Sequence, residues 1–164
     1  MDVYREKCEI LDRLMEEYTK NSVAVAFSGG ADSGLLLKLA VLHGRKNKSR
    51  VFALTAVTDL HPAKDEKIAR EAALDMGAEP KSLRIHELER EDVRQNPVDR
   101  CYRCKKYLFE RIREEAKALG ARGVLEGTNR DDLSQYRPGL RALEELGILS
   151  PLKEAGFTKE EVRR

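Results

Sequence analysis

The stretch VAVAFSGGADSG, residues 23–34, constrains the fold more than any other part of the chain. A short apolar run, residues 23–27, is followed by Gly29 and Gly30, and an apolar segment with helical spacing begins a few residues later. A buried strand that leads through a glycine turn into a helix offers backbone N–H groups to an anion. The pattern therefore predicts a loop that binds nucleotide phosphates.

Two common phosphate-binding motifs do not fit this loop. The dinucleotide fingerprint requires three glycines in a fixed pattern, which is absent here. The Walker motif requires a lysine and a hydroxyl residue after its last glycine, whereas Leu35 and Leu36 follow Gly34. The loop instead offers the hydroxyl groups of Ser28 and Ser33 as hydrogen-bond donors.

Asp32 is the acidic residue of the loop. A carboxylate would repel a phosphate unless a cation lay between them, so Asp32 is a candidate magnesium ligand. The alternative is that Asp32 and Ser33 only cap the helix that begins there.

Short apolar runs and amphipathic segments alternate along the rest of the chain. Such alternation predicts a three-layer α/β/α sandwich, in which a mostly parallel sheet is covered on both faces by helices. Ligands of such sheets bind at the carboxyl ends of the strands. The expected strands are residues 23–27, 51–57, 82–86 and 122–126. The expected helices are residues 2–20, 33–43 (ended by Gly44), 62–76, 102–119, 138–146 and a last one opened by the capping box Thr158–Glu161.

Length and composition predict one soluble domain. The 164 residues suffice for one core, taken as residues 20–150, with an N-terminal helix (1–20) and the start of a C-terminal extension (151–164). The net charge is only +2, which makes nucleic acid an unlikely partner. No apolar run approaches the roughly 18 residues of a membrane helix, and residues 1–18 are too charged for a signal peptide. A cytoplasmic location is expected.

A second polar stretch, GTNRDD, follows the expected strand 122–126. At a parallel strand end beside the phosphate loop, Asp131 or Asp132 would bind magnesium together with Asp32 or hold a substrate. The alternative is ordinary turn chemistry, which Asn and Asp favour. Arg137 and Arg141 follow and would clamp a phosphate or carboxylate through two hydrogen bonds, unless they are surface residues.

The pair Cys101-x-x-Cys104 leaves three alternatives open. Neighbouring cations would lower the pKa of a thiol and favour a reactive or sulfur-carrying thiolate. The cysteines would otherwise have a packing role, or share a metal across a subunit interface of a homo-oligomer. The cations around the pair are Arg100, Arg103, Lys105 and Lys106, of which Arg100 and Lys105 would face an anionic substrate.

The sequence SGGADS between a strand and a helix resembles the PP-loop of the ATP pyrophosphatase superfamily. This resemblance implies the adenine nucleotide alpha-hydrolase-like fold, and cleavage of ATP between its α and β phosphates to give an adenylylated acceptor and pyrophosphate. It also implies that the end of the second strand, at Thr55 and Val57, contacts adenine. Gly34 departs from the family, which usually has Ser or Thr there.

Residues 96–110 and 127–152 narrow the resemblance to the LarE family of ATP-dependent sacrificial sulfur transferases. These proteins adenylylate a pyridinium dicarboxylate mononucleotide and then replace AMP with sulfur. LarE proteins continue beyond the point that matches Arg164, and the sulfur-donating cysteine lies in that further part. A module that binds ATP or AMP without chemistry and a tRNA-thiolating enzyme are the alternatives.

The expected site is thus an ATP and Mg²⁺ site. The residues assigned to ATP are Ala26, Phe27, Ser28, Gly29, Gly30, Asp32, Ser33, Thr55, Val57, Gly127, Thr128, Asn129 and Arg137. The residues assigned to an unidentified acceptor are Arg100, Lys105, Asp131, Asp132 and Arg141. The catalytic candidates are Asp32, Ser33, Cys101 and Cys104, and the metal candidates are Asp32 and Asp132.

Overall fold

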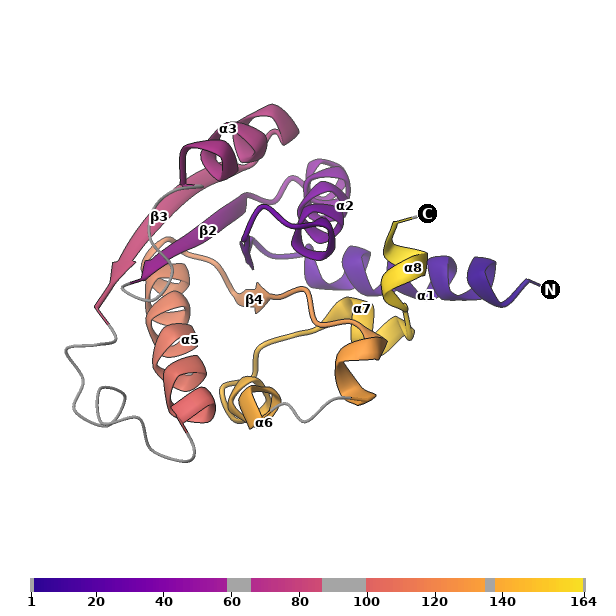
Figure 1. The fold of residues 1–164 in the computed structure, drawn as a ribbon. Coiled ribbons are helices and arrows are strands. Elements are labelled where there is room, and N and C mark those ends of the chain that lie inside the picture. The colour runs from indigo at the N-terminus through magenta and orange to yellow at the C-terminus, as the bar shows by residue number, and fades with distance from the viewer. Residues whose placement is uncertain (1, 59–65, 87–99, 135–137, 164) are drawn as a thin grey trace.

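A parallel sheet of four strands forms the centre of the fold (Figure 1). The computed structural model describes residues 2–58, 66–86, 100–134 and 138–163. The strand order is β3-β2-β1-β4, and every neighbouring pair is parallel. The strands are β1 (Val23–Ala26), β2 (Val51–Thr58), β3 (Glu79–Ile85) and β4 (Gly123–Leu125).

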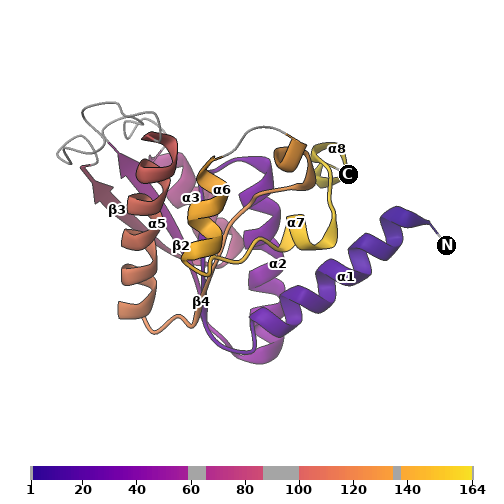
Figure 2. The ribbon, with the colours of Figure 1, turned by 90° about the horizontal axis from the view of Figure 1, so that it is seen from below.

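Helices cover both faces of this sheet, as the view from below also shows (Figure 2). One face packs against α1 (Val3–Tyr18), α2 (Ala31–Asn47), α3 (Glu66–Met76), α7 (Pro151–Ala155) and α8 (Lys159–Val162). The other face packs against α5 (Arg100–Ala118) and α6 (Pro138–Glu145). A short 3₁₀ helix, η3 (Arg130–Ser134), follows β4.

The strand β1 shows why two apolar cores form. Its side chains alternate, so Val23 and Val25 belong to the core under α2 while Ala24 belongs to the core under α5. A strand that is buried on both faces reads as a continuous apolar run, as residues 23–27 do.

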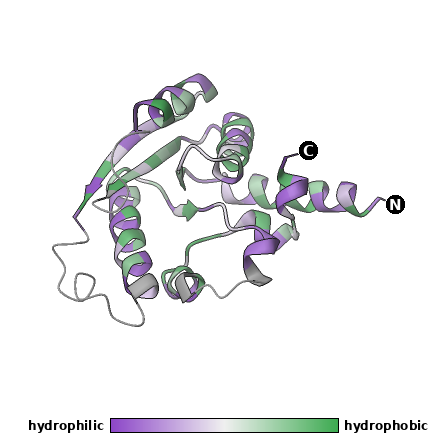
Figure 3. Ribbon diagram, viewed as in Figure 1, coloured by the Kyte–Doolittle hydropathy of each residue, from purple (hydrophilic) through white to green (hydrophobic). Residues whose placement is uncertain are grey.

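The helices mix hydrophobic and hydrophilic residues (Figure 3). The expected three-layer α/β/α fold with a parallel sheet is confirmed.

Successive strands are added on one side of β1 and then on the other. The chain runs from β1 outward to β2 and β3, then returns through α5 to place β4 on the other side of β1. The loops after β1 and β4 therefore leave the sheet side by side at its carboxyl edge. This switch point is where open α/β sheets bind ligands.

The helix α2 is longer at both ends than the sequence predicts. It begins at Ala31 and continues through Gly44 to Asn47, so the prediction that Gly44 ends the helix was wrong. A Cβ atom on Gly44 would lie 2.9 Å from Cγ2 of Val51. Gly44 therefore serves the close packing of α2 on β2. The helix is capped after Asn47 by Lys48, whose φ of 57° is left-handed.

The two edges of the sheet also differ from expectation. The strand β3 begins at Glu79 rather than Ser82 and contains Pro80, which an edge strand tolerates. On the opposite edge, a parallel bridge joins Leu125 to Leu149. The expected helix residues 62–65 and the expected loop 89–99 lie outside the described residues. In the described part of the chain, no helix is both long and apolar enough to cross a membrane.

Candidate active site

The loop after β1 is fixed to the neighbouring strand β2. The N–H group of Phe27 donates to the carbonyl oxygen of Leu54 (2.9 Å), and the hydroxyl group of Thr55 donates to the carbonyl oxygen of Phe27 (2.9 Å). Gly29 then adopts a φ of +87°, which glycine reaches without a steric penalty. Gly30 is the N-cap residue of α2 and has no side chain to occupy the space before the helix.

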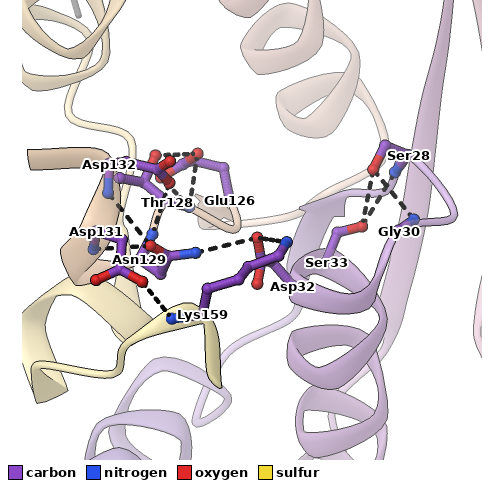
Figure 4. A network of polar contacts seen from close by, with 10 residues as sticks. All are labelled: Ser28, Gly30, Asp32, Ser33, Glu126, Thr128, Asn129, Asp131, Asp132 and Lys159. Atoms are coloured by element: carbon purple, nitrogen blue, oxygen red, sulfur yellow. Dashed lines mark hydrogen bonds and ion pairs between the residues drawn. The ribbon is translucent and has the colours of Figure 1, made fainter. Parts of the chain in front are cut away.

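Two serine hydroxyl groups lie over the first turn of α2 (Figure 4). The Oγ atoms of Ser28 and Ser33 are 3.1 Å apart, and Ser33 Oγ also accepts from the N–H group of Ser28 (3.2 Å). The N–H group of Gly30 donates to Ser28 Oγ (3.3 Å). The first N–H groups of a helix have no partner within it, so this end of α2 is suited to an anion.

Asp32 lies at the same end and contacts two distant segments (Figure 4). Its Oδ2 atom accepts from Nδ2 of Asn129 (3.3 Å) and from Nζ of Lys159 (2.9 Å). Its Oδ1 atom is buried and has no hydrogen-bond partner among the described residues. A buried carboxylate oxygen costs free energy unless it is paired, so this atom is suited to a cation.

Asn129 joins the loop after β4 to the phosphate loop. It is 2% exposed, and its Oδ1 atom accepts from the N–H groups of Asp131 (2.9 Å) and Asp132 (3.3 Å). In turn, the Oδ2 atom of Asp132 accepts from the N–H group of Asn129 (3.0 Å). This exchange caps η3 and leaves Nδ2 of Asn129 to reach Asp32.

Gly127 brings the backbones of the two loops together. A Cβ atom at this position would lie 3.0 Å from both Cβ of Asp32 and the backbone nitrogen of Ser33. A side chain at residue 127 would therefore push the loop after β4 away from α2. The structure thus places Gly127 and Asn129 against the loop after β1. Asp131 and Asp132 lie next to Asn129, to which both are hydrogen-bonded.

Thr128 turns toward a buried carboxylate that sequence reasoning missed. The N–H group of Thr128 lies 3.1 Å from both carboxylate oxygens of Glu126, and its hydroxyl group donates to Oε2 (2.7 Å). The hydroxyl group of Ser150 donates to Oε1. Glu126 is 6% exposed, so this carboxylate, to which both Thr128 and Ser150 donate, is buried beneath the site. The sequence signal was an acidic residue at the end of a buried strand.

Lys159 is the second residue that sequence reasoning missed. It is the first residue of α8, whose N-cap Thr158 accepts from the N–H group of Glu161 as the capping box predicts. The backbone N–H group of Lys159 donates to Oδ2 of Asp131 (2.8 Å) while its side chain reaches Asp32. The capping box located the helix, but nothing in the spacing showed that its lysine meets Asp32.

Three of the residues that were predicted to bind the adenylyl acceptor belong to α5 and α6, on the face of the sheet opposite to α2. They are Arg100, Lys105 and Arg141. The guanidinium carbon of Arg141 lies 4.1 Å from the ring centre of Tyr102, and its Nε atom is 3.7 Å from Oε1 of Glu145. The Nζ atom of Lys105 lies 5.3 Å from the ring centre of Phe109.

The Cys101–Cys104 pair belongs to the first turns of α5. Because α5 connects the carboxyl end of β3 to the start of β4, its first turn lies at the carboxyl edge of the sheet (Figure 1). The Cys104 side chain is half-buried. The side chains of Arg100 and Cys101, and all of Arg137, lie outside the described residues.

Ala26 ends β1, and Val57 is buried near the end of the neighbouring β2. The described residues contain no group of three or more His, Cys, Asp or Glu side chains that would hold a metal. The two metal candidates, Asp32 and Asp132, each bond to Asn129.

No protein-family model matches the chain. Its fold matches the NH3-dependent NAD synthetase from Campylobacter jejuni with a TM-score of 0.67, at 20% identity over 99% of this chain and 71% of that chain. It matches the U34-tRNA thiolase NcsA from Methanococcus maripaludis with a TM-score of 0.65, at 17% identity over 98% of this chain and 62% of that chain. The chain therefore has the fold of these two proteins, the adenine nucleotide alpha-hydrolase-like fold.

The chain is also a homologue of a LarE protein, the pyridinium-3,5-bisthiocarboxylic acid mononucleotide synthase of Lactiplantibacillus plantarum. The two are 37% identical over 142 residues, which are 86% of this chain and 50% of the synthase. The chain spans about half the length of the curated relatives it matches.

Proposed function

We propose that this chain binds ATP at residues 27–33 and supports its cleavage between the α and β phosphates, so that an acceptor becomes adenylylated. The wider role is sulfur transfer in the biosynthesis of a nucleotide cofactor. The observation that supports this proposal most strongly concerns the Oδ1 atom of Asp32. This atom is buried, has no hydrogen-bond partner among the described residues, and lies next to a glycine turn at the switch point of the sheet.

The chain's own groups have separable tasks in this proposal. The N–H groups at the start of α2 and the hydroxyl groups of Ser28 and Ser33 hold the phosphates. Lys159 supplies a positive charge beside them, and Asn129 orients the Asp32 carboxylate. Fixed donors and charges of this kind stabilise the charge that develops as the phosphate bond breaks.

Asp32 would also hold Mg²⁺. The fit rests on its buried Oδ1 atom, which is without a hydrogen-bond partner in the described part of the chain. Mg²⁺ is usually bound by one or two carboxylates together with substrate phosphates. When bound, Mg²⁺ neutralises negative charge on the departing pyrophosphate.

The proposed reaction is a displacement at the α phosphorus of ATP. An acceptor oxygen forms the new bond to phosphorus, the bond to the bridging α–β oxygen breaks, and pyrophosphate leaves with the bonding electrons. We propose a pyridinium-3,5-dicarboxylic acid mononucleotide as the acceptor. The L. plantarum relative is a pyridinium-3,5-bisthiocarboxylic acid mononucleotide synthase, and this acceptor is the corresponding dicarboxylic acid.

A pyrophosphate-release assay with Mg²⁺, ATP and this acceptor tests the proposal. Asp32→Asn should lower the release rate by about a hundredfold, because the metal loses its carboxylate. Asp75→Asn is the matched control, since Asp75 is exposed on α3. Undiminished release from the Asp32→Asn protein would rule out this mechanism.

A binding module without chemistry is the second candidate. The aligned part is about half of each curated relative, so the homology supports the site more directly than the complete reaction. This candidate predicts clear binding of ATP by titration calorimetry and no pyrophosphate with any acceptor.

A further inference from the structure

We infer that Lys7 of the N-terminal helix is a positioning residue of the site, which acts by holding α8 so that Lys159 reaches Asp32. This inference rests on the proposed ATP site. The Nζ atom of Lys7 lies 2.8 Å from Oε1 of Glu161, a residue 154 positions further along the chain. The pair thus joins the first helix to the last one.

The helix α8 cannot hold its own position. It has four residues, Lys159–Val162, and an isolated helix of that length is unstable in water. Neighbouring contacts fix its start: the N–H group of Arg130 donates to the carbonyl oxygen of Phe157 (2.7 Å), and the Phe157 ring packs edge-on against Tyr4 of α1. The orientation of Lys159 therefore depends on tertiary contacts, several of them with α1.

The Lys7–Glu161 pair is a charged contact between α1 and α8, and it is shielded from water. The two side chains are 14% and 15% exposed. Oε1 of Glu161 also accepts from the Thr158 hydroxyl (3.1 Å), while Oε2 is buried without a partner among the described residues. Removal of Lys7 would leave a buried carboxylate without its counter-charge, which is strongly unfavourable.

The consequence for the site follows from the short distance along the chain. Glu161 lies two residues after Lys159, and both belong to the single turn of α8. If Glu161 moves toward water to regain solvation, the turn moves with it. The bonds from Lys159 to Asp131 and Asp32 are then lost. Lys7 would therefore influence ATP binding without contacting ATP.

A double-mutant cycle of ATP binding, measured by titration calorimetry with Mg²⁺ and ATP, tests this inference. Lys7→Met should weaken ATP binding about tenfold in the wild-type background and less than twofold in the Lys159→Met background, because coupled residues are not additive. Lys7→Arg keeps the charge and should bind like the wild type. Arg5→Met is the matched control on the same helix, since Arg5 is 78% exposed and pairs with Glu9.

Hydrogen exchange of the Lys159 amide, which donates to Asp131, gives a second readout that needs no ATP. It should quicken in Lys7→Met and stay unchanged in Arg5→Met. Glu161→Gln replaces Lys7→Met in both experiments if the latter does not fold. Equal effects of Lys7→Met in both backgrounds, or an unchanged Lys159 amide, would overturn the inference. Absence of ATP binding by the wild type would contradict the proposed function alone, and the exchange experiment would still decide the role of Lys7.

Discussion

The Nζ atom of Lys159 lies 2.9 Å from Oδ2 of Asp32, although 127 residues separate them in the chain. The Asp32 side chain is 20% exposed and that of Lys159 is 42% exposed, so the pair borders the solvent. We expect Lys159, held in this position, to face the phosphates of Mg²⁺-bound ATP, while the Oδ1 atom of Asp32, which has no hydrogen-bond partner among the described residues, faces the metal.

Substitution of Gly127 by alanine should weaken ATP binding about tenfold and destabilise the fold by about 1–3 kcal/mol, because the new Cβ atom overpacks the contact with α2. That atom would lie 3.0 Å from both Cβ of Asp32 and the nitrogen of Ser33. Calorimetric titration and thermal unfolding measure the two effects. Gly123→Ala is the control, since its Cβ atom would lie 3.8 Å from Cδ1 of Leu149. Unchanged ATP affinity in the Gly127 variant would contradict the proposed geometry.

Two glycines of the same helix should respond to alanine in opposite directions. Gly34→Ala should stabilise the protein by up to about 1 kcal/mol, because alanine is the better helix former. Apart from adjacent residues and nearby helix backbone, no atom of the described residues lies within 4 Å of the new Cβ. Gly44→Ala should destabilise by about 1–3 kcal/mol through overpacking, since its Cβ atom would lie 2.9 Å from Val51. Urea denaturation of both variants checks the signs. Stabilisation by both would show that α2 does not pack tightly on β2.

Glu126→Gln should lower the free energy of unfolding by about 1–3 kcal/mol. Among the described residues, the hydrogen-bonding groups of Thr128 and Ser150 that contact this carboxylate are donors, so an amide NH2 group would face donors. Glu144→Gln is the control because that side chain is 70% exposed. Denaturant midpoints compare the two. Equal stability of the Glu126 variant and the wild type would mean that the carboxylate is not the hub of these bonds.

The Lys7–Glu161 pair predicts a specific dependence of stability on pH. Burial raises the pKa of Glu161. The hydrogen bonds from Lys7 and Thr158 and the charge of Lys7 together lower this pKa by more than burial raises it, so it falls below the ordinary value of 4.5. A depressed pKa contributes stability that is complete above the ordinary value and is lost as the pH falls through the folded value. The stability difference between wild type and Lys7→Met should therefore be largest near neutral pH and shrink below about pH 4.5.

Urea denaturation of both proteins at pH 7 and at several acidic values measures this difference. Glu161→Gln serves as the reference, because it has no carboxylate to titrate at this position. A constant difference between wild type and Lys7→Met across the acidic range would contradict the assignment of the pair.

The sequence was sufficient to predict a glycine turn between a buried strand and a helix, and the layers around it. The continuous apolar run of residues 23–27 indicated a buried strand, and Gly29 marked the turn that follows. The prediction that residues 127–132 lie next to this loop required only the rule that parallel strands end at one edge. Local signals of this kind are readable because each element carries its own pattern.

The remaining features depend on contacts between distant segments. Gly44 has the same local signature as a glycine that ends a helix, and only the proximity of Val51 shows that it serves packing. The sequence around Lys159 predicts only a short helix, and its contact with Asp32 is visible only in the folded chain. The side chain of Glu126 is likewise explained by Ser150, which lies 24 residues further on.

The two edges of the sheet have a consequence for association with other chains. On one side, the segment around Leu149 accepts from the N–H group of Glu126 and donates to the carbonyl oxygen of Val124, so it covers β4. On the other side, β3 carries Pro80, which lacks an N–H group, and the exposed charges of Lys81 and Arg84. Proline and lysine on an edge strand oppose pairing with a foreign strand. The sheet is thereby protected against edge-to-edge aggregation.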